Sequence, residues 1–125
     1  MAVTYPTAVK NARLDAVTTA AGATAVLEIG TTGMVSILAT FALTNPIAPA
    51  AASGILTIDF SPAISDASAD NSGTAAAARI RTASGGTDII TGLTVGTSGT
   101  DIILDSVSIT AGQTVTITSG TITHA

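Results

Sequence analysis

The side chains that could carry out acid–base or nucleophilic chemistry are few in this 125-residue chain. His124 is the single histidine, and cysteine is absent. A serine nucleophile needs a neighbouring base, so a Ser–His pair would depend on His124, next to last in this sequence, where we expect little order. Asp101 and Asp105 are carboxylates that could do acid–base work, but a solvated surface position explains them more simply. We therefore expect no catalytic residue and no enzyme activity.

Metal binding is the second chemistry to consider, because the stretch SDASADNSG is rich in Asp and Asn. Asp66, Asp70 and Asn71 do not have the spacing of a calcium-binding EF-hand loop, since the next acidic residue is Asp88. Turns in which Asp or Asn side chains accept backbone N–H groups explain these residues. The segment GTTG lacks the lysine of a phosphate-binding loop. We expect no metal, no cofactor and no small-molecule substrate.

The composition excludes other classes of partner and favours self-association. The formal net charge is −4, with four Lys and Arg residues, so the basic surface that nucleic acid requires is missing. Charged residues make up 10% of the chain, against about 25% in an ordinary domain. A small apolar protein with so few charges tends to associate. The sequence therefore predicts a homo-oligomer, with a trimer as the first expectation.

The four cations are candidates for an interface. Arg79 and Arg81 are two residues apart, so they share one face if their segment is a strand. We expect them to pair with carboxylates of this chain or of a neighbour and to anchor an interface, with a solvated strand face as the alternative. Lys10 and Arg13 are the other two candidates, on a predicted helix.

One helix is expected, over residues 6–21, within an N-terminal arm of residues 1–22. Pro6 suits its first position and Gly22 its C-terminal cap. The expected apolar face is mostly alanine, so it needs a surface to dock on, either the sheet of its own domain or a neighbouring subunit. That face consists of Val9, Ala12, Ala16, Val17 and Ala20.

Residues 23–125 are predicted to form a mainly β domain, a β-sandwich or jelly-roll-like fold of about seven short strands. In the last strand, Ser119 and Gly120 are expected to form a bulge, because Ile117 and Ile122 otherwise point to opposite faces. Segment 74–83 contains four consecutive alanines, which favour a helix, but its length and flanking glycines favour a strand. The predicted strands cover 24–30, 34–44, 55–60, 74–83, 88–95, 101–109 and 114–124.

No apolar run is long enough for a transmembrane helix, which needs about 20 residues. The longest candidate, MVSILATFAL at 34–43, has ten residues and contains Ser36 and Thr40. The N-terminal sequence lacks the apolar core of a signal peptide. We therefore expect synthesis in the cytoplasm and no membrane partner.

Several segments resemble a known class of proteins. The segments GTAAAARIR, VGTSGTDIIL and ITAGQTVTI, together with TYPTAVKNARLDAV and LEIGTTGM, are similar to small structural proteins of tailed-bacteriophage virions. The similarity runs over nearly the whole chain. It implies a virion structural component, most plausibly a capsid decoration (cement) protein on the head exterior whose partners are the major capsid protein and itself. It marks no functional residues. An adhesin or receptor-binding module of a tail or fibre, or a tail-tube component, are the alternatives.

Overall fold

The computed structural model describes residues 4–59 and 65–123. In these ranges the chain forms the helix α1 (Thr7–Ala21), a short 3-10 turn η1 (Thr32–Met34) and ten strands. The strands are β1 (Val26–Gly30), β2 (Ile37–Ala42), β3 (Ile55–Thr57), β4 (Ser65–Asp66), β5 (Gly73–Thr74), β6 (Ala77–Arg81), β7 (Asp88–Gly96), β8 (Ile102–Leu104), β9 (Ser108–Ile109) and β10 (Val115–Thr123).

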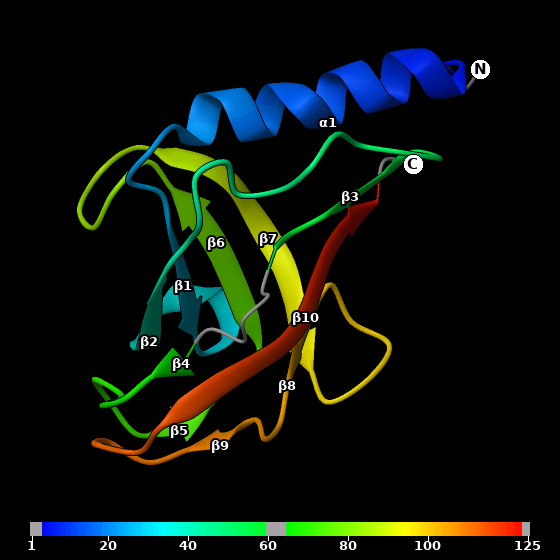
Figure 1. The fold of residues 1–125 in the computed structure, drawn as a ribbon. Coiled ribbons are helices and arrows are strands. Elements are labelled where there is room, and N and C mark those ends of the chain that lie inside the picture. The colour runs from blue at the N-terminus through cyan, green and yellow to red at the C-terminus, as the bar shows by residue number, and fades with distance from the viewer. Residues whose placement is uncertain (1–3, 60–64, 124–125) are drawn as a thin grey trace.

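Most strands belong to one curled sheet that the helix covers at one end (Figure 1). Its order is β2-β1-β6-β7-β8-β10-β3, with β4 also paired to β10, while β5 and β9 form a separate two-stranded sheet. All pairs are antiparallel except β7 with β8. The mainly β, sandwich-like fold with one N-terminal helix is thus confirmed.

The core fills the inside of the curl. On β1, Leu27 lies opposite Phe41 of β2 and Ile80 of β6, and these side chains are at most 1% exposed. Successive residues of a strand alternate between its faces, so Arg79 and Arg81 lie on the outer face. The strand interpretation of segment 74–83 is confirmed, since β6 pairs with both β1 and β7.

A polar seam links β2, at one edge of the sheet, to the segment beside β10. The N–H of Thr40 on β2 donates to Asp66 Oδ2 over 3.0 Å, and the N–H of Asp70 donates to the Leu38 carbonyl over 2.8 Å. Asn71 Nδ2 donates to the Ile37 carbonyl over 2.9 Å. Because an unpaired strand edge invites pairing with another chain, these bonds protect the β2 edge.

β10 contains a bulge, one residue earlier than predicted: Thr118 is the extra residue, whereas Ser119 and Gly120 pair regularly with Ile103 and Ile102. The register with β8 shifts between Ile117 and Ser119, and both Ile117 and Ile122 are buried. Thr114 and Thr118 lie on the exposed side, as the alternation predicts. The extra residue restores the inward direction of the apolar side chains after the interruption.

The predicted apolar face of the helix is wrong except at Val17, which is half-buried and packs against the core. Ala12, Ala16 and Ala20 are exposed and Val9 is 40% exposed, whereas Leu14 and Ala21 are buried. The helix lies over its own domain and contacts β3 and β7. Helix α1 also begins one residue later than expected, because Pro6 keeps an extended backbone and its carbonyl accepts the N–H groups of Val9 and Lys10.

Two polar side chains explain the helix orientation. Asn11 Oδ1 accepts the N–H of Gly54 over 2.9 Å, and Asp15 Oδ1 accepts the N–H of Ala51 over 2.8 Å. A buried backbone donor without an acceptor is costly. The helix therefore turns Asn11 and Asp15 toward the segment before β3, and the alanines face away.

All seven predicted strand segments contain a strand, with one of them divided. Segment 101–109 holds β8 and β9, the two-residue strand β4 lies outside the predicted segments, and β5 overlaps segment 74–83 at Thr74. A strand of two residues is too short to show an alternation of apolar and polar side chains, so the sequence pattern could not predict these strands. No helix within the described ranges is long and apolar enough to cross a membrane.

Candidate interaction site

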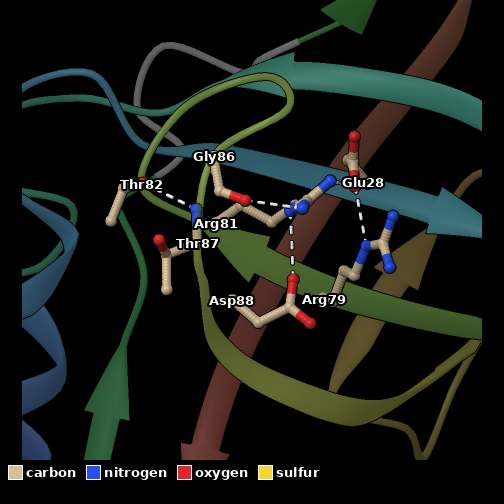
Figure 2. Close-up of polar contacts among 7 residues, drawn as sticks. All are labelled: Glu28, Arg79, Arg81, Thr82, Gly86, Thr87 and Asp88. Carbon is tan, nitrogen blue, oxygen red and sulfur yellow. Dashed lines mark hydrogen bonds and ion pairs between the residues drawn. The ribbon is translucent and has the colours of Figure 1, made fainter.

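Four charged side chains gather on the outer face of β1, β6 and the start of β7 (Figure 2). We call them the ion-pair cluster: Glu28, Arg79, Arg81 and Asp88. Arg79 Nε donates to Glu28 Oε1 over 2.7 Å, and Arg81 Nη1 lies 3.7 Å from the same oxygen. Arg81 Nε lies 3.0 Å from Asp88 Oδ1, an ion pair without hydrogen-bond alignment. The cluster contains two cations and two anions and is formally neutral.

Glu28 is the buried centre of this cluster, with 8% of its side chain exposed. A carboxylate taken out of water is costly unless it is paired, and here two guanidinium groups flank it. Strand pairing brings them together, because Glu28 lies directly opposite Arg79 in the register of β1 and β6. The sequence predicted that both arginines pair with carboxylates of this chain or of a neighbour, and both pair with carboxylates of this chain.

Arg81 also organises the turn between β6 and β7. Its Nη2 donates to the carbonyl of Gly86, while Thr82 and Thr87 bond to each other across the turn. Figure 2 shows Gly86 above the Arg81 guanidinium and Asp88 on its other side. These contacts hold Asp88 at the rim of the cluster, where 45% of its side chain is exposed.

Arg79 has donor capacity that the described residues do not use. Only its Nε forms a hydrogen bond with them, and Figure 2 shows one of the two Nη atoms on the side of the guanidinium opposite Glu28. A guanidinium group can bind a carboxylate with two parallel N–H donors. Arg79 can therefore serve Glu28 through Nε and a second acceptor through its Nη atoms.

A bulge in β7 leaves open space beside Arg79. Two β7 residues, Thr91 and Gly92, lie opposite the single β6 residue Arg79, and both are exposed. Gly92 has a φ of 77°, and nothing lies within 4 Å of the position that a Cβ would take. Bulges of this kind redirect side chains and are common beside functional sites.

Lys10 and Arg13, the other two candidate interface residues, lie on α1 and apart from the ion-pair cluster. Arg13 is exposed and its Cζ lies 4.6 Å from the centre of the Tyr5 ring, in a cation–π contact. Lys10 is half-buried on α1. No ion pair within the described ranges connects either residue to Arg79 or Arg81.

A groove of about 650 Å³ is a second feature, one that the sequence did not suggest. Its size falls within the usual range of ligand sites, about 300–1,000 Å³. The groove lies between the segment that follows β2, the end of β3 and the bulge of β10, and its lining has no cation. The residues are Thr44, Asn45, Pro46, Ala48, Pro49, Thr57, Ile58, Asp59, Thr118, Ser119 and Gly120.

The carboxylates considered for chemistry have structural positions. Asp101 Oδ2 accepts both the N–H and the hydroxyl of Thr94 and so fixes the β7–β8 loop. Asp66 Oδ1 accepts the N–H of Ser68, the predicted Asx turn. Asp105 is exposed. No group of three metal-ligating His, Cys, Asp or Glu side chains occurs in the ranges that the structure describes. His124 and Phe60 lie outside these ranges.

Glu28 and Asp88 are the two members of the cluster that sequence reasoning missed, and Glu28 left the clearer signal. It is the single charge in the apolar segment TAVLEIG, and a charge in a strand flanked by apolar residues signals a buried partner. Comparison with protein-family models, with curated proteins and with solved structures returned no match for this chain.

Proposed function

We propose that this protein is a structural subunit of a tailed-phage virion, most plausibly a decoration protein that lies on the exterior of the head and bridges capsid subunits. The observation that carries the proposal is the scarcity of charge on its surface. All twelve charged residues, four basic and eight acidic, lie within the described ranges, and four of them are exposed. The exposed ones are Arg13, Asp70, Asp88 and Asp105.

The scarcity of exposed charge is found on a chain of ordinary compactness. The accessible surface is 6225 Å², close to the roughly 6,000 Å² expected for a folded monomer of this mass. A surface of ordinary size that is made mainly of Thr, Ser, Ala and Gly repels neighbouring copies only weakly. Such a surface suits a subunit that remains bound to other subunits in an assembly.

The resemblance of the sequence to small tailed-phage structural proteins supports the virion role within this class. A decoration protein touches several shell subunits at once, and its affinity then comes from many small contacts. A rigid β-domain can add buried area at each junction without any chemistry. About 1,000 Å² per site is enough when the contact is repeated over a lattice.

The test compares phage particles that contain the protein with particles from which its gene has been deleted. We expect hundreds of copies per particle by gel densitometry, and DNA release on heating at a lower temperature in the deletion particles. Adding back the purified protein should restore the release temperature. Equal release temperatures would contradict the decoration role.

The groove beside β10 favours a second candidate, a receptor-binding module of the tail or fibre. Its volume suits a ligand, and its lining offers hydroxyl groups, an amide and a carboxylate. The same particles distinguish the two roles. A receptor-binding module predicts a few copies per particle and reduced adsorption to host cells, with DNA release unchanged.

A further inference from the structure

We propose that the outer face bearing the ion-pair cluster is a two-fold interface with a second copy of this chain, in which Arg79 of each copy pairs with Asp88 of the other. The starting point is the pair of charges at the rim of the cluster. The Nη atoms of Arg79 form no hydrogen bond with the described residues, whose bond to this side chain is made by Nε, and Asp88 keeps 45% of its side chain exposed. One is an unused donor and the other an acceptor with free capacity.

The arrangement of these charges is self-complementary. In a contact with two-fold symmetry, residue i of one copy meets residue j of the other, and j meets i. A two-fold axis that lies in the plane of the contact, parallel to the sheet face and midway between Arg79 and Asp88, brings Arg79 of each copy opposite Asp88 of the other. Each copy then contributes one cation and one anion to two equivalent ion pairs, and Glu28 and Arg81 keep their internal partners.

The surroundings of Arg79 allow close approach. The bulge residues Thr91 and Gly92 are exposed, and the space beside Gly92 is open. Ala77 on the same strand is half-buried and Ala42 on β2, two strands away, is exposed, so the side chains at these positions are short. A second sheet face can therefore come near enough for the guanidinium group to reach a carboxylate.

The charge inventory identifies a second copy as the occupant. Of the four exposed charged residues, three are aspartates and one is Arg13, which stacks on Tyr5. An acidic or neutral surface of this kind offers carboxylates to Arg79. Asp88 is the exposed carboxylate that borders the cluster itself, at the start of β7, where it pairs with Arg81.

This inference does not depend on the virion role. It predicts dimers, or assemblies built from dimers, where the sequence led us to expect a trimer. Failure of the particle experiment would leave the two-fold contact standing, and a monomer in solution would leave the decoration role standing, because shell binding can be carried by other faces.

The experiment uses charge reversal in the full chain, followed by sedimentation equilibrium over micromolar to millimolar concentrations. R79E and D88R should each raise the dimer dissociation constant by about tenfold or more, because each places like charges opposite each other twice. An equimolar mixture of the two variants should associate again. The introduced glutamate of one variant then meets the introduced arginine of the other, and the native Asp88 meets the native Arg79. Damage to the fold of either variant cannot be repaired by mixing.

The matched control is D105R, which reverses an exposed aspartate outside the cluster. It should dimerise like the unaltered chain, and it should not restore association to R79E. If R79E fails to fold, R79Q and D88N replace the two variants: each removes both ion pairs from its own homodimer, and their mixture restores one of them, so association should recover in part. A dimer that R79E and D88R leave unchanged, a mixture that does not reassociate, or an unaltered chain that is monomeric throughout would each overturn the proposal.

Discussion

Glu28 lies between Leu27 and Ile29 on a strand whose five residues are all buried. Its carboxylate has lost most of its water, and its charge is balanced by Arg79 and Arg81, whose side chains are 23% and 21% exposed. Removing one partner of a buried pair costs more than removing an exposed partner, because the remaining charges lose their compensation. The more exposed ion pair between Arg81 and Asp88 should contribute far less to the stability of the fold.

We predict that two conservative substitutions in the ion-pair cluster lower the free energy of unfolding by different amounts. Glu28→Gln should lower the free energy of unfolding by about 1–3 kcal/mol, with the partial exposure of the arginines limiting the loss. Asp88→Asn should lower it by less than about 1 kcal/mol. Urea unfolding of the two variants measures the difference. Equal losses would show that burial of Glu28 does not control the energetics of the cluster.

Asn11 and Asp15, two polar side chains outside the predicted apolar face, attach the helix to the rest of the domain. Asn11 and Asp15 are one turn apart, so both reach the segment that enters β3. That segment makes a tight turn in which Ser53 and Gly54 both have positive φ, and Ala52 and Ile55 exchange backbone hydrogen bonds across it. The turn presents its N–H groups to the helix.

We therefore expect Asp15→Ala to loosen α1 selectively. Loss of the acceptor for Ala51 N–H should speed hydrogen exchange of the α1 amides by about tenfold, whereas exchange in β1 and β6 should change little. Arg13→Ala, on the exposed face of the same helix, is the control and should leave both rates near their original values. Uniform acceleration across helix and sheet would mean that docking and folding are inseparable.

On the scale of the whole molecule, the helix and the curled sheet share one core. Leu14 of α1 is 4% exposed and belongs to the same apolar cluster as Leu27, Ile80 and Ile117. A chain with one continuous core of this size usually unfolds in a single transition. The surface around that core has little charge, which is the property that led us to propose a structural subunit.

Leu14→Ala should accordingly destabilise the entire protein, by about 2–5 kcal/mol, because it leaves a cavity in the shared core. Helix content followed by circular dichroism and protection of β1 amides should be lost at the same urea concentration. Ala16→Ser, on the exposed face of α1, should leave the midpoint within error of the unaltered chain. Two separate transitions would indicate that residues 1–22 behave as an independent arm.

The sequence by itself determined the class of fold, the position of seven strand segments, the helix to within a residue and the presence of a bulge in β10, which lies at Thr118 beside the predicted Ser119 and Gly120. These features follow from local rules: alternation of apolar side chains, β-branched residues, and proline and glycine at the ends of elements. It also placed Arg79 and Arg81 on one face, because the period of a strand is two.

Only the tertiary structure decided which carboxylates meet those arginines and which face of the helix is buried. Glu28 is 51 residues from Arg79 along the chain, and the strand order that brings β1 beside β6 has no local signature. The helix orientation depends on backbone donors at Ala51 and Gly54 that need acceptors, a requirement that arises when the two segments meet. Periodicity describes one element at a time, whereas these contacts belong to pairs of elements.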